Sequence, residues 1–409
     1  MRDGLRSSGA SRRRHGSRSV CKYGGLHRRY ANLEKPSPLR YTLPAKLALL
    51  LLLPVIMAGC AALPLDLSAI PAPIAADDVA ALLPTLTPAP GATPPALDTG
   101  APAEAPVRTI PLAGPAAQRN AEFSAMAWYG DTLIMLPQYP NFTADGASAA
   151  YALPRADIIA WLDGAITGPL TPAPVAFDYS GVAEWLPGFE GFEALAFRGD
   201  SVFATTEVTA NGQTAAYLVS GSVDADNATI RLDAATLTWI QPQTALPNFS
   251  DEAIIVTPDG GLISLYEING AAWNPNPVAH RFNADLAPLD PVPSPSVEYR
   301  ITDATSLDEQ GRFWAINMYF PGEAFLVAPA DPIAAQYGEG PTHAAQEQVE
   351  RLLEFAWDGA QVTRTDTPPM QLALTLLARN WEGIVRLDDR GFLLITDQFP
   401  ETVLGFVAR

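Results

Sequence analysis

The stretch FEALAFRGDSVFATTE at residues 192–207 contains the pattern that decides the fold. An acidic residue, Glu193, is followed by a small residue, a short apolar run and a Gly-Asp turn. A second run, rich in β-branched and aromatic residues, then ends in a polar residue, Glu207. Such runs on both sides of a Gly/Asp turn predict a β-hairpin.

The same pattern occurs five times in the chain. The other copies are FSAMAWYGDTLIMLPQ at 123–138, DEAIIVTPDGGLISLYE at 251–267, TDATSLDEQGRFWAIN at 302–317 and WEGIVRLDDRGFLLITD at 381–397. In every copy 14 or 15 residues separate the first polar residue from the last. A strand, a turn and a returning strand occupy that length, so both polar residues are expected at the same edge of the sheet.

The distances between copies predict a β-propeller. The first polar residues follow one another after 69, 59, 51 and 79 residues, which leaves room for four strands and variable loops in each repeat. Four-stranded repeats arranged radially form the blades of a propeller, an all-β fold. Residues 215–223 and 228–240 are expected to supply the third and fourth strands of the second blade.

The number of blades depends on how the propeller closes. Only TVLGFV (402–407) follows the last hairpin, so this blade needs another strand, and VRTIPL (107–112) is available. Closure by this N-terminal strand favours five blades. Six blades remain an alternative, with a degenerate blade between Asp303 and Glu382, where HAAQEQVERLLEF (343–355) resembles a helical insertion.

The charge distribution divides the chain into a basic leader and an acidic domain. Residues 1–59 contain twelve basic and two acidic residues, whereas the rest contains 14 basic and 42 acidic ones, a net charge of −28. Such a domain repels nucleic acid, so nucleic-acid binding is not expected. Cys21 and Cys60 are the two cysteines, which excludes a disulfide framework in the domain.

The leader ends in a predicted secretion signal. KLALLLLLPVIMAGC (46–60) has a positive flank and an apolar run shorter than the roughly 20 residues of a transmembrane helix. Its ending resembles a bacterial lipobox, which implies a lipid on Cys60. We therefore expect a signal at 1–59, a Pro/Ala-rich spacer at 60–107 and a propeller at 108–409, anchored to a bacterial membrane in the cell envelope. The alternative is an ordinary signal peptide or an uncleaved anchor with an incidental cysteine.

The polar residues of the repeats are expected to gather at one mouth of the central channel. These residues are Ser124, Glu193, Glu252, Asp303 and Glu382 at the starts of the copies, and Gln138, Glu207, Glu267, Asn317 and Asp397 at their ends. Converging carboxylates need protons, arginines or a metal ion, and hard oxygen ligands suit Ca²⁺ or Mg²⁺. The alternative is that they only fix the blades in register. Arg300 and Arg379 each precede an acidic member by three residues, and either neutralise the ring or receive a substrate.

The motifs GFEALAF, NFSDEAIIV, YRITDAT and RNWEGIV resemble the blade motifs of the "esterase-like activity of phytase" domain. They are loosely similar to those of gluconolactonase and senescence-marker propellers. In those lactonase-type enzymes an axial divalent cation is held by Glu, Asn and Asp side chains. The resemblance implies Glu193, Glu252, Asn317 and Asp397 as counterparts, with Asp303 and Glu382 as further acidic candidates.

Two functions follow as expectations. The first is a metal-assisted hydrolase of a small ester, lactone or phosphoester, in which Glu382 or Glu252 activates water and Arg379 or Arg300 stabilises the developing charge. The second is a non-catalytic envelope propeller that binds a small ligand or a protein. A serine hydrolase is disfavoured, because His280 and His343 are the only histidines after the leader and neither lies in a hairpin copy.

Overall fold

The computed structural model describes residues 100–409, which fall within one compact unit. The predicted leader, the signal with Cys60 and the spacer up to residue 99 lie outside the described residues. No helix among residues 100–409 has the length and apolar character needed to cross a membrane.

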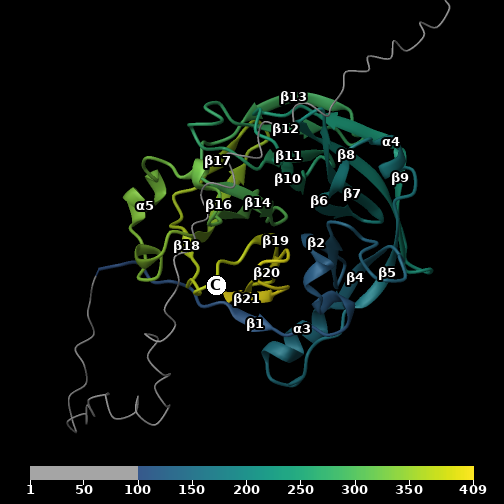
Figure 1. Ribbon diagram of the computed structural model, residues 1–409, viewed down its shortest axis with the longest axis horizontal. Coiled ribbons are helices and arrows are strands. Elements are labelled where there is room, and N and C mark those ends of the chain that lie inside the picture. Colours follow the sequence, from purple (N-terminus) through teal and green to yellow (C-terminus); the bar gives the residue numbers. More distant parts are fainter. Residues whose placement is uncertain (1–99) are drawn as a thin grey trace, which may run out of the picture. The chain divides into compact units, whose positions relative to one another are not determined.

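All five predicted hairpins are present, and each pairs an innermost strand with the next strand outward (Figure 1). They are β2 (Phe123–Tyr129) with β3 (Thr132–Pro137), β6 (Phe189–Arg198) with β7 (Ser201–Ala210), β10 (Asp251–Val256) with β11 (Leu262–Tyr266), β14 (Arg300–Ala304) with β15 (Arg312–Tyr319), and β19 (Trp381–Leu387) with β20 (Gly391–Thr396). Their turns place a glycine, or Asp388 in the last hairpin, at positive φ, which explains the repeated Gly/Asp signal.

Further strands complete the blades outward. They are β4 (Ala149–Pro154) and β5 (Ala173–Asp178), β8 (Gln213–Asp224) and β9 (Thr229–Ile240), β12 (Val278–Phe282) and β13 (Pro288–Pro293), β16 (Val349–Trp357), β17 (Val362–Arg364) and β18 (Met370–Gln371), and β21 (Leu404–Ala408). The predicted strands at 215–223 and 228–240 are thus confirmed as β8 and β9. The first two blades also join edge to edge through a parallel pairing of β5 with β9.

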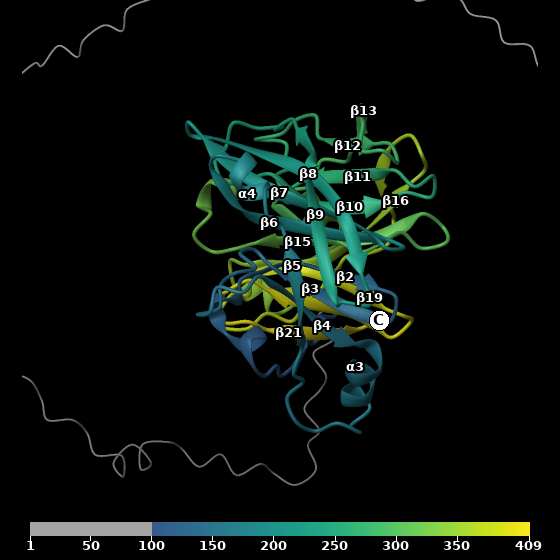
Figure 2. The ribbon, with the colours of Figure 1, turned by 90° about the vertical axis from the view of Figure 1, so that its right-hand side faces the viewer.

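The N-terminal strand closes the propeller. Strand β1 (Arg108–Ile110) pairs antiparallel with β21, the last strand of the chain, and completes a four-stranded sheet with β19 and β20. Neighbouring innermost strands contact each other in the closed order β2, β6, β10, β14, β19 (Figure 1). Figure 2 shows the same propeller turned by 90°. A narrow cavity of about 100 Å³ is lined from all five blades. The described residues therefore form five blades around one axis.

Apolar side chains fill the space between adjacent blades, with one buried cluster at each of the five interfaces. Phe192 lies between the first and second blades, and Trp381 between the fourth and fifth, both fully buried. This burial of apolar surface is the main source of stability for the ring.

A β-bulge explains why each copy begins with a polar and then a small residue. The register between the innermost strand and its partner shifts at Ser124, Glu193, Glu252 and Glu382, and across Thr302 and Asp303 in the fourth blade. A bulge re-aims the side chain that it carries. The residue after the bulge is Ala or Gly because neighbours are close: a Cβ on Gly383 would lie 2.8 Å from Ile395.

The predicted helical insertion at 343–355 is wrong. Only a short 3-10 turn, His343–Ala345, is present, and the following residues form strand β16. The polar positions that suggest an exposed helix face are buried in β16 and paired: Arg351 with Asp331, and Glu350 with Arg379. No sixth blade is present among residues 100–409, because β16 is the third strand of the fourth blade.

Short helices lie in the segments that connect the strands. They are α3 (Arg155–Leu162), α4 (Val182–Trp185), α5 (Pro332–Tyr337) and the 3-10 turns Pro115–Ala117, Arg119–Ala121 and Ala324–Leu326. The last residues of the predicted spacer contact the propeller, since Ala105 bridges to Leu372 and Glu104 accepts hydrogen bonds from Thr342 and His343.

Candidate active site in the axial cavity

An acidic cavity of about 270 Å³ lies where the innermost strands begin. We call it the axial cavity. Seven of the ten polar repeat residues line it: Ser124, Gln138, Glu193, Glu207, Glu252, Glu382 and Asp397. The bulges supply Ser124, Glu193, Glu252 and Glu382, and the outward strands or their ends supply the others. The spacing of the repeat thus identified most of this lining.

Arg300, at the start of β14, is the positive centre of the cluster. Its Nε donates to Glu267, its Nη2 lies 2.9 Å from Glu382 Oε1 and its Nη1 donates to Asn380 Oδ1 at 3.0 Å. Glu252 Oε2 and Glu323 Oε1 lie within 3.8 and 3.4 Å of the same guanidinium. One buried cation therefore serves several buried carboxyl groups, too few charges for all of them to be ionised.

The second blade supplies two carboxyl groups, Glu193 and Glu207, that form no ion pair with a cation among the described residues. Burial and the nearby Glu267 carboxylate together raise the pKa of Glu207 to about 8. Burial and Glu207 also raise the pKa of Glu193 well above its usual range, although Gln138 Nε2 donates a hydrogen bond to Glu193 Oε1 at 3.1 Å. This side of the cavity therefore retains protons at neutral pH.

On the side of the cavity nearest Arg300, a cation opposes the effect of burial on the pKa of the carboxyl groups. Burial raises the pKa of Glu382 to about 8, while Arg300 opposes this rise. Burial and the Glu267 carboxylate raise the pKa of Glu252, whose Oε2 has no hydrogen-bond partner among the described residues. Ionisation of Glu382 is thus favoured by its contact with Arg300, which Glu207 lacks.

Asp397 and Asn380 complete the wall beside Glu382. Asp397 Oδ1 accepts from the Phe399 amide at 2.7 Å, and Asp397 Oδ2 accepts from Asn380 Nδ2 at 2.9 Å. Burial raises the pKa of Asp397 despite these hydrogen bonds. Asn380 in turn accepts from Arg300, so Asp397 is held in place through Arg300.

Two predicted metal ligands, Asp303 and Asn317, do not line the axial cavity. Asp303 accepts hydrogen bonds from the amides of Ala304 and Ile384, both at 2.7 Å, and so fastens the fourth blade to the fifth. Asn317 donates to the carbonyl groups of Glu298 and Arg300 and accepts from Arg351 Nε at 2.7 Å. The bulge in β14 spans two residues, Thr302 and Asp303, whereas the bulges at the start of the other copies span one.

Arg379 also lies outside the cavity lining. Its Nη2 lies 2.7 Å from Glu350 Oε2, and the same carboxylate accepts from Trp381 Nε1 at 2.7 Å. The expectation that Arg379 neutralises the ring through Glu382 is therefore wrong. Arg300 does neutralise the ring, but through Glu267 and Glu382 and not through Asp303. Spacing by three residues did not predict these partners, because both arginines pair with carboxylates distant in sequence.

Sequence reasoning missed several residues of the cavity. Glu122, Asn248, Glu323 and Asn380 line it together with Phe123, Phe249, Phe320 and Phe399. Asn248 and Asn380 stand just before copies of the repeat, in NFSDEAIIV and RNWEGIV, which was an available signal. Glu323 follows β15 in a loop that has no counterpart in the repeat.

The cluster fits the expected Ca²⁺ or Mg²⁺ poorly. Among residues 100–409, no three acidic or histidine side chains converge in an arrangement that could hold a metal ion. Arg300 already occupies the position between Glu267, Glu382 and Glu252 that a cation would need. The groups in the cavity that can take part in chemistry are therefore its carboxyl groups and Arg300.

The histidines and the Trp273 loop lie elsewhere. His280 is a residue of strand β12, and His343 begins the 3-10 turn, where its Nδ1 lies 2.9 Å from Glu104 Oε1. Trp273, in the segment between β11 and β12, donates from Nε1 to the Phe325 carbonyl at 3.0 Å and packs edge-on against the Phe325 ring. None of the three lines the axial cavity.

No protein-family model and no curated protein sequence matches the chain. The resemblance to the phytase-associated and lactonase-type propellers therefore stays a prediction.

Solved structures of similar fold are known. An exo-1,5-alpha-L-arabinanase from a bovine ruminal metagenomic library has a TM-score of 0.41 and 9% sequence identity, over 72% of this chain and 94% of that one. A GH43 endo-arabinanase from Bacillus licheniformis has a TM-score of 0.41 and 9% identity, over 73% and 96%. A member of the GH130 family of mannoside phosphorylases has a TM-score of 0.41 and 11% identity, over 70% and 84%. This similarity is distant and concerns the fold.

Proposed function

We propose that the axial cavity is the active site of a hydrolase that cleaves a C–O bond by carboxyl acid–base chemistry. The observation that carries the proposal is the presence, in one cavity, of buried Glu207 and Glu382, whose pKa values are both raised to about 8. Carboxyl groups with pKa values near the working pH can give up and take up protons efficiently. The proposal differs from the sequence-based expectation because it needs no metal ion.

The two glutamates have different roles. Glu207, without an ion pair, is the proton donor to the oxygen of the leaving group. Glu382, whose ionised form is stabilised by Arg300, accepts a proton from the attacking water. Hydrolysis breaks the C–O bond, adds one water and moves one proton from Glu207 to the product and one from water to Glu382. Exchange with solvent then restores both groups.

The cavity limits the class of substrate. Its volume of about 270 Å³ is near the lower end of ordinary ligand sites, so the reacting part is small. An acidic lining in a domain of net charge −28 disfavours phosphoesters and other anions. A small uncharged glycoside is the first candidate, because cleavage by two carboxyl groups suits an acetal. An uncharged lactone or ester is the second candidate.

The test is turnover on a panel of aryl glycosides, lactones and aryl esters, with and without EDTA. We expect one class to be hydrolysed in EDTA, and Glu382→Gln and Glu207→Gln each to lower kcat by about 10²–10⁴-fold. Glu401→Gln, which changes an exposed carboxyl group outside the cavity, is the matched control and should retain full activity.

Two results contradict the proposal. Loss of activity in EDTA would favour the metal-assisted reaction expected from the sequence. No turnover on any class, from folded protein, would favour the alternative of a non-catalytic propeller that binds a ligand or a protein.

A further inference from the structure

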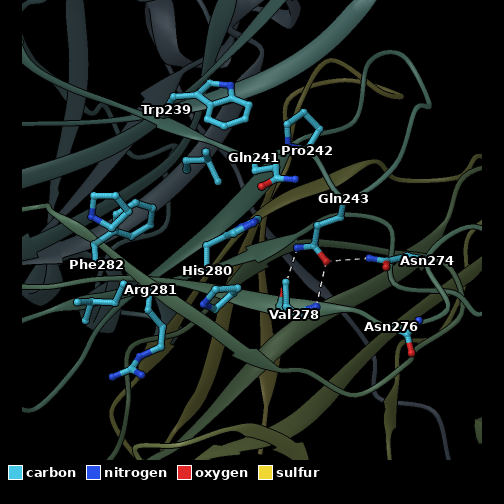
Figure 3. Close-up of a pocket in the computed structure, with 14 residues that line it drawn as sticks. Trp239, Gln241, Pro242, Gln243, Asn274, Asn276, Val278, His280, Arg281 and Phe282 are labelled. Atoms are coloured by element: carbon cyan, nitrogen blue, oxygen red, sulfur yellow. Dashed lines mark hydrogen bonds between the residues drawn. The ribbon is translucent and has the colours of Figure 1, made fainter.

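A second, larger pocket lies at the outer edge of the propeller, between the second and third blades (Figure 3). We call it the rim pocket. It has a volume of about 480 Å³ and is formed by the end of β9, the residues after it and strands β12 and β13. None of its lining residues belongs to the axial cavity. It is therefore a separate candidate for ligand binding.

One side of the rim pocket is apolar and aromatic. The indole of Trp239 is 52% exposed although it lies on a strand, and Leu289 is 42% exposed. Figure 3 shows Trp239 on the same side as Gln241 and Pro242, with Val278, His280 and Phe282 on the adjacent strand. An exposed indole offers a flat apolar face for contact with a ring.

The polar side of the pocket is fixed before any ligand binds. Gln243 Oε1 accepts from Asn274 Nδ2 and from the Val278 amide, both at 3.0 Å, and Gln243 Nε2 donates to the Val278 carbonyl at 2.8 Å. His280 Nδ1 lies 2.9 Å from Asp251 Oδ1, which also accepts from Ser264 Oγ at 2.6 Å. These contacts hold the imidazole and the Gln243 amide in place.

Three polar groups remain available to a ligand. His280 Nε2 and the side-chain amides of Gln241 and Asn276 make no hydrogen bond to any described residue. An amide both donates and accepts, which matches hydroxyl groups. Arg281 also lines the pocket, but its guanidinium packs 5.6 Å from the centroid of the Trp357 ring.

From this arrangement we infer that the rim pocket binds an uncharged sugar ring. The apolar C–H face of a pyranose stacks on Trp239, and its hydroxyl groups meet the Gln241 amide and His280 Nε2, which lie at the same end of the pocket as Trp239. An anionic ligand is disfavoured, because the domain is strongly acidic and His280 is engaged by Asp251. A cationic ligand is disfavoured, because no Asp or Glu is among the residues that line the pocket. The inference does not depend on the reaction proposed for the axial cavity.

The experiment titrates the purified protein with methyl glucoside, methyl mannoside and methyl xyloside, followed by tryptophan fluorescence and ligand-observed NMR. At least one glycoside should bind saturably, and Trp239→Ala and Gln241→Ala should each weaken binding about tenfold or more, since about 1.4 kcal/mol corresponds to tenfold. Trp185→Ala is the matched control: Trp185 is 69% exposed on α4, outside the rim pocket, and its removal should leave binding unchanged.

A further variant separates the two cavities. Glu382→Gln alters the axial cavity alone and should bind the glycoside with unchanged affinity. No saturable binding of any glycoside would overturn the inference, as would binding that survives both rim substitutions. Binding that disappears in Glu382→Gln would place the sugar in the axial cavity instead.

Discussion

At the scale of single residues, Arg300 determines whether the axial carboxyl groups can coexist. It contacts Glu267, Glu382 and Asn380 and is itself buried. We expect Arg300→Gln to lower the free energy of unfolding by about 3–5 kcal/mol at neutral pH, because buried carboxylates lose their cation. Urea denaturation measures this change.

A double variant provides the control. Adding Glu267→Gln to Arg300→Gln removes one uncompensated carboxylate and should recover part of the loss. If Arg300→Gln costs less than about 1 kcal/mol, a value typical of an exposed ion pair, Arg300 does not hold the cluster together.

The same residues predict an alkaline pH dependence for the proposed reaction. Glu382 must be ionised to accept a proton, so activity rises with pH through its pKa of about 8. Glu207 must be protonated to donate, so activity falls as pH rises through its own pKa of about 8. We expect an optimum of kcat/KM near pH 8. An optimum between pH 4 and 5, where unperturbed glutamates titrate, would contradict these roles.

At the scale of elements, strand β1 is the segment that closes the propeller. Ile110 is fully buried in the cluster between the fifth and first blades, whereas Thr109 on the same strand is exposed. Ile110→Ala should lower the free energy of unfolding by about 2–5 kcal/mol, because it leaves a cavity where the ring closes. Thermal unfolding detects this change.

The matched substitution on this strand is Thr109→Ala, for which we expect a change within about 0.5 kcal/mol. Equal effects of the two substitutions would mean that β1 adds little to closure.

The elements also show what the sequence could predict. The hairpins and the closing strand could be predicted from local signals, namely the alternation of apolar and polar residues, the Gly/Asp turns and the spacing of the copies. A hairpin is present at each of the five copies. Strand β16 was mistaken for a helix because its polar residues Glu350, Arg351 and Glu354 are buried, with partners from distant segments. Likewise, the repeat identified most of the axial lining, but not Glu323 or the partners of Arg300 and Arg379, which depend on tertiary packing.

For the whole molecule, we expect the free energy of unfolding to fall as pH rises from about 4.5 to about 8, because several glutamates retain protons in the folded state. Glutamates whose pKa is raised in the folded state bind protons that the unfolded chain releases above about pH 4.5. Their stabilising contribution is complete below that pH and is lost as pH rises through about 8. The loss is about 1.4 kcal/mol for each pH unit that separates the folded-state pKa from the unfolded-state pKa. Urea denaturation as a function of pH measures this slope, and Glu207→Gln should reduce it.

The location of the whole protein remains a proposal that rests on Cys60. Cys60→Ser should release the chain from the membrane fraction of a bacterial host, since the acylated thiol is removed. Cys21→Ser, which changes the other cysteine, should leave the chain membrane-bound. Equal distribution of both variants and the parent chain would contradict a lipid anchor.

The most direct test of the central claim is carbon-13 NMR titration of the glutamate carboxyl groups in the folded protein. A cluster gathered around Arg300 should show at least two glutamates, Glu207 and Glu382, that titrate near pH 8, and Glu207→Gln should remove one of these transitions. If every glutamate titrates near its ordinary value of about 4.3, the carboxyl groups do not share a buried site and the proposed acid and base do not exist.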